Sequence, residues 1–498
     1  MAANVEEKDP GIPLQPATEA TPFAKGDTKT FAATQHDGFK DDAQPISPSG
    51  QMIQGNQTAA PPEHKELKSG MNVPQTAIFI ASQVSGLTFL VIPPQLVDSG
   101  WPGLFVYPIV SAIAIYTAVL LGRSWNILRR RKPEMCRDCR LPYSALAGEA
   151  FGPIGKSVIS FTIGVIGLAS TCTFLLGVSE LMFSIIYPYQ TFSFCLWPVI
   201  IFIVVCPLLW FTGPKELWEI AAVGTFATFL GTYILGLKSV GVLGGVSNKP
   251  LHIITHSSKS DGGWSGIFGL IGSSFFLMGP HYLWPTIQRD MAEPQHFTKA
   301  LVNGMGMQVI AMYVLVIPIW LAYSSPIAEL GYVESLLQAV QPGPVRTVVS
   351  VLLLFHFVAV LVMSNNPLFH ELEHKFDVPH EFSWKRVVLR TLIFMVELLI
   401  VESFPHFAIV TSLTGGICMT ALALIAPIFI HLKLRLLETA DDPDEAGVSM
   451  PDKLVCILTI PAYIMIIGGL IYYTKFNISD GVTILTVPCY VNASAAHV

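Results

Sequence analysis

The chain has 498 residues, of which 52% are hydrophobic and 13% are charged, and its formal net charge is −6 at pH 7. Soluble domains carry about 25% charged residues, so this chain has too few charged side chains to cover a water-facing surface. Many runs of about 20 apolar residues are each long enough to cross a bilayer as a helix. The composition therefore excludes a soluble protein and predicts an all-α polytopic membrane protein.

The first 70 residues differ from the rest of the chain. They are acidic and rich in Pro, Gln, Thr and Ser, and they contain few large apolar residues. A segment of this composition cannot bury enough surface to order itself, and this one also lacks a hydrophobic signal core. We therefore predict that residues 1–70 form a disordered cytosolic tail without a cleavable signal peptide.

Eleven apolar segments follow, and we expect each of them to cross the membrane. They make up a transmembrane domain at 74–474, which is followed by a short tail at 475–498. The approximate limits of the segments are 74–97, 102–122, 157–186, 194–212, 218–240, 264–285, 300–323, 346–367, 386–403, 407–431 and 454–474.

Lysine and arginine are distributed unevenly between the loops that join these segments. The loop after the second segment reads GRSWNILRRRKPEMCRDCR, the strongest basic cluster in the chain, whereas loops 187–193 and 404–406 contain no lysine or arginine. Cytoplasmic loops are enriched in these residues. We therefore expect the N-terminus in the cytosol and, because the number of segments is odd, the C-terminus on the extracellular or lumenal side.

Asn-X-Ser/Thr sequons provide a test of this orientation. Asn477 and Asn492 lie in the C-terminal tail, on the expected outer side, and are candidates for glycosylation. Asn56 lies in the expected cytosolic tail and should remain unmodified. The plasma membrane and an endolysosomal or vesicular membrane both fit this topology.

Two segments, the first (74–97) and the sixth (264–285), contain Gly, Ser and Pro at membrane depth. Irregular backbone survives there only where it is buried in protein or lines a cavity. In secondary transporters, the freed backbone groups of two such segments hold the substrate and the coupling ions. The alternative is that Gly and Ser merely let helices pack closely. The first interpretation gives these candidate substrate-binding residues: Ser82, Ser85, Gly86, Leu87, Thr88, Ser273, Ser274, Gly279 and His281.

The two interrupted segments lie five segments apart. This spacing fits two five-helix repeats, at about 74–240 and about 264–431, with an additional helix at 454–474. A repeat with an odd number of helices must be inverted relative to its partner in the membrane. The sequence therefore predicts a 5+5 inverted repeat in which helices 1 and 6 are broken.

Short motifs in this part of the chain are similar to those of a known family. Segment 1 carries Gly86, Leu90 and Pro93 and is followed by Gly100-Trp101. The residues after segment 2 read LPYSALAGEAFGPIGK, those after segment 6 read PTIQRDMAEPQHF, and segment 8 ends in SNNPLFHELE. In this order, the motifs make the chain resemble the amino acid/auxin permeases, within the amino acid–polyamine–organocation superfamily. The region after segment 6 looks more like the vacuolar and vesicular branch.

The resemblance implies the inverted-repeat fold of the leucine-transporter type, with an amino acid held between helices 1 and 6. It also implies transport driven by H⁺ or, in some members, Na⁺, without another cofactor. The chain departs from the family pattern at Ser82, Thr88, Pro94 and Pro280-His281, so the substrate cannot be copied from any one relative. The outer loops 241–263 and 324–345 contain no Cys, which excludes the disulfide that some branches form between them.

Titratable side chains inside apolar segments are the candidates for proton coupling: Glu180, His281, His356 and Glu397. Such groups are costly in a bilayer and are suspected of function by default. A His, or a carboxyl group in a buried site, can bind H⁺ on one side and release it on the other. His281 has the best position, in the break of segment 6. The alternatives are that each His bonds a backbone group and that Glu180 contacts the substrate or a neighbouring helix. For Glu397 the alternative is that it faces a crevice, because Arg390 is about 10 Å away along the helix, too far for an easy pair.

The remaining motifs do not indicate an enzyme. Cys136 and Cys139 form a lone CxxC, whereas a structural zinc site needs four ligands, so a pair of reduced thiols is the simpler interpretation. His370, Glu371 and His374 match the H-E-x-x-H pattern of zinc proteases without an evident third ligand. No P-loop motif is present, so ATP does not drive the protein directly. We predict neither a catalytic site nor a bound metal.

These observations predict a secondary active transporter of small neutral amino acids, coupled to H⁺ and working by alternating access. Its partners would be the amino acid and the lipid bilayer, and no nucleic acid. The alternative is an amino acid sensor on the same fold, which binds its ligand without substantial flux and signals through the acidic tail.

Overall fold

The computed structural model describes residues 70–137, 139–186, 193–211, 218–239, 263–322, 335–379, 381–404, 407–441, 450–479 and 488–492. The predictions for the tail before Gly70 and for Asn56 lie outside these ranges, and so does the prediction for the side chain of Asn477. Lys65–Val498 form one compact unit.

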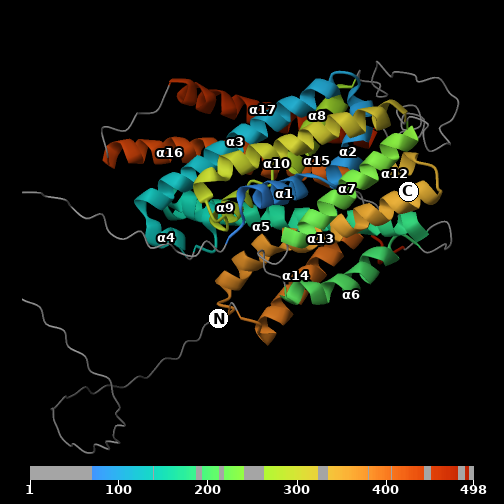
Figure 1. Ribbon diagram of the computed structural model, residues 1–498, viewed down its shortest axis with the longest axis horizontal. Helices are drawn as coiled ribbons and strands as arrows, with labels where there is room; N and C mark the ends of the chain where they lie inside the picture. The colour runs from blue at the N-terminus through green and yellow to red at the C-terminus, as the bar shows by residue number, and fades with distance from the viewer. Residues whose placement is uncertain are drawn as a thin grey trace, which may run out of the picture. The chain divides into compact units, whose positions relative to one another are not determined.

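The described part of this unit is helical, and its only β pairing is an isolated bridge between Met71 and Met291. Most of the long helices run in roughly the same direction (Figure 1). In chain order the elements, with 3-10 and π-helical turns labelled η, are α1 (Val73–Val84), α2 (Leu87–Ser99), α3 (Gly103–Arg131), α4 (Pro133–Arg137), α5 (Pro142–Ile186), α6 (Leu196–Phe211), α7 (Trp218–Ser239), α8 (Trp264–Met278), α9 (Trp284–Arg289), η2 (Pro294–His296), α10 (Phe297–Ala311), η3 (Met312–Val316), α12 (Leu336–Ala339), α13 (Pro344–Lys375), α14 (Trp384–Ser403), α15 (Phe407–Thr414), η4 (Gly415–Met419), η5 (Ala421–Ile425), α16 (Ala426–Asp441) and α17 (Met450–Ser479).

The prediction of a polytopic all-α membrane protein is confirmed. Within the described ranges, seven helices are long and apolar enough to cross a membrane, and the bent pair α1–α2 makes an eighth span. The shorter apolar helices α6 and α8, together with α14, occupy the remaining expected segments. Each of the eleven expected segments therefore corresponds to helical structure.

The first span is broken where the sequence predicts it. α1 and α2 are bent by 46° relative to each other. Between them, Gly86 has φ 68° and ψ −89°, in the half of backbone space that a residue with a Cβ atom rarely adopts. α1 itself begins with a capping box in which Asn72 and Gln75 exchange side-chain-to-backbone hydrogen bonds of 2.9 Å.

A second backbone break, inside α5, was not expected from the sequence. Gly152 has φ 72° and ψ −163°, so two helices meet at a kink there. The part before Gly152 precedes the predicted third segment, and the part after it forms that segment. The kink allows one continuous stretch of helical residues to change direction at this point.

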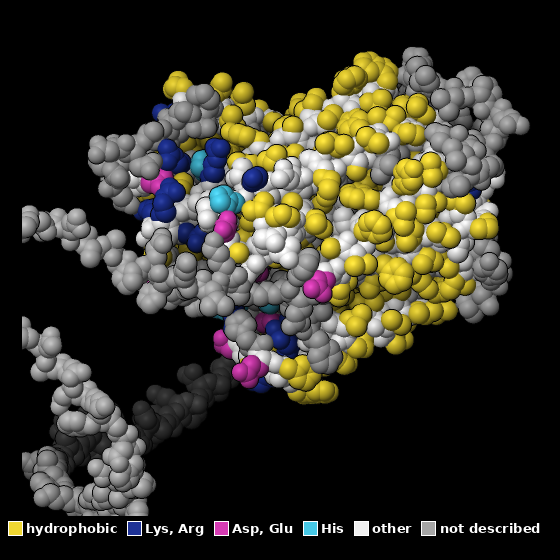
Figure 2. All heavy atoms as spheres, viewed as in Figure 1, with side chains coloured by type: hydrophobic (Ala, Val, Ile, Leu, Met, Phe, Trp, Pro, Cys, Tyr) yellow, Lys and Arg dark blue, Asp and Glu magenta, His cyan; other side chains and the backbone are white. Residues whose placement is uncertain are grey.

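Charge is concentrated at one end of the bundle. Figure 2 shows hydrophobic side chains spread over much of the visible surface, with Lys and Arg gathered at one end. Arg129, Arg130 and Arg131 form the last turn of α3 at this end, and we call it the basic end. Exposed large apolar side chains such as Ile203 and Phe226 cover the helices between the two ends, as a bilayer requires.

A disulfide joins Cys195, just before α6, to Cys489 near the C-terminus. The two residues are 294 positions apart in the sequence, and the sequence analysis did not predict their pairing. The backbone N–H of Cys489 also donates to the carbonyl of Glu402 at the end of α14, with an N···O distance of 2.8 Å. α3 starts at this end of the bundle and finishes at the basic end, so we call it the disulfide end.

The eleventh span, α17, packs closely against α8 and η4 through glycines. A Cβ atom on Gly272 of α8 would lie 3.0 Å from Leu470, and one on Gly269 would lie 2.7 Å from Tyr473. On the other side of this contact, the ring of Phe268 of α8 lies where a side chain on Gly469 of α17 would be. The helix outside the two repeats is therefore fitted tightly to the first half of the broken sixth span.

Candidate functional site

The break in the first span brings several of the predicted residues together. The hydroxyl of Ser85 donates to the carbonyl of Ala81 at 2.6 Å, and the hydroxyl of Thr88 donates to the carbonyl of Val84 at 2.7 Å. Both hydroxyls thus satisfy backbone carbonyls next to the break. Ser82 is fully buried, and its hydroxyl makes no hydrogen bond to the described residues.

The break in the sixth span separates α8 from α9. Gly279 ends α8 with φ −107° and ψ 24°, and the backbone N–H of His281 turns back to the Gly279 carbonyl at 2.5 Å. A Cβ atom on Gly279 would collide with the carbonyl oxygen of Phe275. Between Gly279 and the start of α9 at Trp284 the α-helix is therefore interrupted by a turn, in which the N–H of Leu283 donates to the carbonyl of Pro280 at 2.9 Å, as the Gly-Pro-His sequence predicts.

A small cavity of about 20 Å³ lies between the two breaks. Its lining comes from both broken spans and from α5, α13 and η4, and it contains no charged side chain. The volume is enough for about one water molecule, so an amino acid fits only if the walls move. The lining residues are Gln83, Ser85, Leu87, Ser170, Phe174, Phe276, Leu277, Pro280, Tyr282, Leu283, Val360, Ser364 and Met419.

A larger cavity of about 740 Å³, the vestibule, extends from the basic end to this small cavity. Its lining includes Arg140, Arg289 and Glu371 toward the basic end. The vestibule and the small cavity share Gln83, Tyr282 and Leu283 as lining residues. These three side chains therefore form the wall that separates the two spaces.

Tyr282 is the central residue of this wall. Its ring is almost fully buried, and its hydroxyl lies near the hydroxyls of Ser170 on α5 and Ser364 on α13. Beside it, the side-chain amide of Gln83 donates to the sulfur of Met363 at 3.1 Å. The sequence analysis did not single out Tyr282, Gln83, Ser170 or Ser364.

At the disulfide end, α12 covers the bundle. Leu336 and Leu337 of α12 are 1% exposed, and Ser335 at its start donates a hydrogen bond to the carboxylate of Glu180 on α5. Arg346 of α13 donates to the hydroxyl of Ser184 and to the carbonyl of Val340, both at 2.9 Å. We call the contacts of Glu180 and Arg346 the α12 network.

The predicted residues of α8 lie away from the small cavity. The hydroxyl of Ser273 accepts from Gln95 of α2 and is 2.8 Å from the hydroxyl of Ser412 on α15. Ser274 is buried and its hydroxyl makes no hydrogen bond to the described residues. The imidazole Nε2 of His281 is 3.0 Å from the hydroxyl of Thr117 on α3, on the side of the break that faces α3.

His356, by contrast, lies directly against the break in the first span. A Cβ atom on Gly86 would be only 2.5 Å from Nε2 of His356, and one on Gly224 of α7 would be 3.2 Å from Nδ1. The ring is fully buried, and neither nitrogen completes a hydrogen bond to the described residues. The absence of side chains at both glycines makes the space for this imidazole.

Glu397 is fully buried between α5, α13 and α14. Its carboxyl group lies beside Asn365 of α13, and its backbone carbonyl accepts from the thiol of Cys172 at 3.7 Å. Arg390 does not pair with it, because that guanidinium donates to Glu373 at 2.7 Å and to the carbonyl of Leu209. This arrangement agrees with the helical distance that made an Arg390–Glu397 pair unfavourable.

The motifs that resemble metal or catalytic sites are engaged in other contacts. Glu371 accepts from the hydroxyl of Ser144 at 3.3 Å. Burial raises the pKa of the Cys136 thiol to about 11, which disfavours the thiolate that metal binding requires. Among the described residues, the one cluster with three ligand atoms close enough for a metal consists of Cys195, Glu402 and Cys489. Both of its cysteines are joined in the disulfide, so neither offers a thiolate.

Comparison with known proteins gives consistent matches. A family model described as "Transmembrane amino acid transporter protein" matches residues 69–472. "Amino acid transporter AVT1I" of Arabidopsis thaliana is 22% identical over 376 residues, which are 72% of this chain and 85% of that protein. "Amino acid transporter AVT1C" of the same plant is 23% identical over 354 residues, which are 69% of this chain and 60% of that protein. These relatives are described as transporters, not as enzymes.

Solved structures show the fold. The crystal structure of MhsT in complex with L-phenylalanine has a TM-score of 0.53 at 12% sequence identity and covers 80% of this chain and 98% of that one. The match places the chain in the leucine-transporter type of fold, with its inverted repeats and its two broken helices. At this identity, the likeness concerns the fold alone.

Proposed function

Because this chain belongs to the family of transmembrane amino acid transporters, we propose that it carries small neutral amino acids across a membrane by alternating access, coupled to H⁺. The observation that carries the proposal is the small cavity between the two broken spans. Among the described cavities, the vestibule at the basic end is the one that extends to it. Such a closed space between broken helices is where secondary transporters bind their substrates.

The lining of the small cavity supports a neutral substrate. It offers hydroxyl and amide groups from Ser85, Ser364 and Gln83 but no charged side chain, and a charged substrate side chain without a partner would be costly there. The freed backbone at both breaks can bind the amino and carboxylate groups of the amino acid itself. The rings of Phe174 and Phe276 limit the size of the substrate side chain.

His356 is the coupling residue that the geometry favours. Its imidazole touches Gly86 at the break, so a change in its charge acts directly on backbone groups that would hold the substrate. Imidazole changes charge near neutral pH when it has access to water. Glu397, Glu180 and His281 remain candidates for the proton route, but the side chains nearest to Gly86 are those of His356 and Phe357.

The orientation follows from two features at opposite ends. Lys and Arg gather at the basic end (Figure 2), which is typical of the cytoplasmic side. The disulfide is at the other end, and disulfides persist in extracellular or lumenal compartments. We therefore propose that the vestibule opens to the cytosol and that the exposed Asn492 is on the outer side.

Uptake by the purified full-length protein in liposomes tests the transport proposal. A panel of labelled amino acids is offered with and without a pH gradient, and a protonophore is added as a control. We expect uptake of small neutral amino acids that the gradient stimulates and the protonophore removes. Binding of an amino acid without flux under any gradient would contradict the proposal and favour the sensor.

A further inference from the structure

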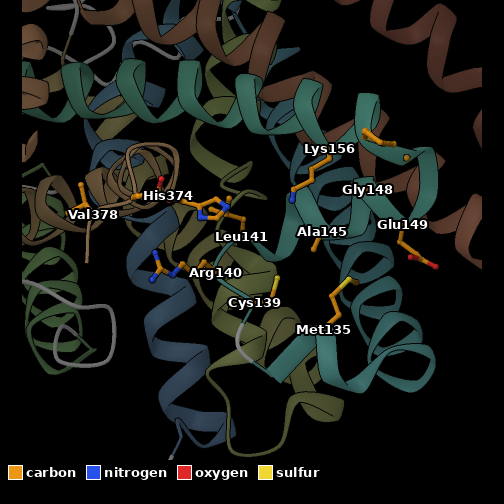
Figure 3. Close-up of a pocket in the computed structure, with 13 residues that line it drawn as sticks. Met135, Cys139, Arg140, Leu141, Ala145, Gly148, Glu149, Lys156, His374 and Val378 are labelled. Atoms are coloured by element: carbon orange, nitrogen blue, oxygen red, sulfur yellow. The ribbon is translucent and has the colours of Figure 1, made fainter. Parts of the chain in front are cut away.

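A second large cavity lies at the basic end beside the vestibule, with which it shares Arg140 and Leu141 as lining residues. It has a volume of about 960 Å³ and is bounded by α4, both parts of α5 around the kink, and the end of α13. Lys156, Arg140 and His374 contribute positive or titratable nitrogen atoms to its lining. Figure 3 shows the side chains of Lys156 and His374 reaching toward the middle of the pocket.

Of the two carboxylates that line this cavity, one is paired with basic side chains outside its lining and the other is exposed to water. The carboxylate of Glu149 pairs with Lys132 at 2.6 Å and with Arg131 at 3.4 Å, and in Figure 3 it points away from the pocket. Asp377 is exposed to water. Among the described residues, Lys156 and Arg140 have no carboxylate within ion-pair distance. Glu371, which lines the vestibule, is another carboxylate close enough to interact electrostatically with Lys156.

An exposed apolar ridge begins at the rim of this cavity. Ile154 and Phe161 of α5 are 78% and 74% exposed, and Phe151 and Val158 are exposed on either side of Ile154. The spacing of three and four residues places Ile154, Val158 and Phe161 on one face of the helix. This face leads from the cavity into the part of α5 that crosses the membrane.

We propose that this cavity binds an anionic phospholipid, with the phosphate groups of its head group on Lys156, Arg140 and His374 and its acyl chains along Ile154 and Phe161. Basic pockets at the cytoplasmic membrane surface attract such lipids electrostatically, and the ridge supplies the apolar contact that a soluble phosphate cannot use. The bound head group would join the part of α5 after Gly152, and Arg140 just before α5, to the end of α13. The proposal does not depend on which substrate the protein carries.

Binding measurements on the full-length protein in neutral detergent test this assignment. The probes are long-chain phosphatidylinositol 4-phosphate, phosphatidylcholine with the same chains, and soluble inositol 1,4-bisphosphate. We expect the anionic lipid to bind at least about tenfold more tightly than phosphatidylcholine, and Lys156→Gln to weaken its binding about fivefold. Lys299→Gln, which changes an exposed lysine at the start of α10, is the matched control and should have no effect.

The apolar part of the proposal has its own variant. Ile154→Ser should weaken binding of the lipid but not of inositol 1,4-bisphosphate, whereas Ile457→Ser, at an exposed position of α17, should change neither. Equal binding of phosphatidylcholine, or equal losses with Lys156→Gln and Lys299→Gln, would overturn the site. Tight binding of the soluble phosphate with no effect of Ile154→Ser would show that the cavity takes a soluble anion and not a lipid.

Discussion

The vestibule extends inward from the basic end, between α1, α5, α9 and α13, whereas at the disulfide end α12 is packed onto the bundle and hydrogen-bonded to α5 and α13. One end is held open to water and the other is covered by a short helix with a polar network. Between them, a wall with Tyr282 at its centre separates the vestibule from the small cavity. The difference indicates a state that is open at the basic end only, in which transport requires α12 to be released and the Tyr282 wall to part.

The largest expected effect concerns the break that lies between the two ends. Gly86→Val would add a branched side chain at positive φ and against the ring of His356, at a cost of about 2–6 kcal/mol. We expect uptake in liposomes to fall to the background level. Gly306→Val on α10, where a Cβ atom meets nothing within 4 Å, should retain uptake. Full activity of the Gly86 variant would disprove the role of this break.

The α12 network offers a way to loosen only the covered end. Arg346→Ala removes the hydrogen bonds to Ser184 and Val340, which are worth about 1–3 kcal/mol in total, so the outward-facing state should become more populated. A cysteine introduced on α12 should react about tenfold faster with a membrane-impermeant thiol reagent added on the side of the disulfide end. Unchanged labelling would show that α12 is held by Leu336 and Leu337 alone.

Variants of His356 and His281 show which of the two histidines couples transport to H⁺. His356→Gln removes the titratable ring at the break, and we expect it to flatten the dependence of uptake on pH. His281→Gln keeps a side chain that can bond Thr117 on α3 and should leave that dependence intact. The reverse result, with a flat profile only for His281→Gln, would restore the coupling role that the sequence assigns to His281.

The smallest effect on transport is expected at the disulfide. The double variant Cys195→Ser, Cys489→Ser frees the C-terminal segment from α6 and should lower the free energy of unfolding by roughly 2–4 kcal/mol. The unfolding temperature should therefore fall by several degrees, with uptake at room temperature little changed. As a control, a reducing agent should lower the unfolding temperature of the native protein but not that of the variant. An equal decrease in both would show that the lower stability does not come from this disulfide.

The sequence predicted the spans because apolar runs of this length have one physical solution in lipid. It predicted both breaks because Gly and Pro interrupt helices at membrane depth, although Gly269 and Gly272 serve close packing against α17 instead. The kink at Gly152 was missed because it lies outside the apolar run. The pairing of Cys195 with Cys489 could not be chosen from eight cysteines, since they are distant in the sequence.

The lining of the small cavity was harder to predict from the sequence. Ser273 is a predicted substrate-binding residue, and its hydroxyl lies against Gln95 and Ser412, outside the lining of the small cavity, because residues on one helical segment can point to either side. Tyr282 and Ser364 were missed because their proximity depends on the packing of separate spans. Local sequence patterns do not contain that information.

The glycine-mediated fit of α17 against α8 has a practical consequence. Leu470 and Tyr473 occupy the spaces beside Gly272 and Gly269, so α8 cannot tilt during a transport cycle without displacing α17 as well. Because Ile457 and Ile464 of α17 are exposed at the surface, a fluorescent reporter attached there would follow the motion of α8 from outside the small cavity.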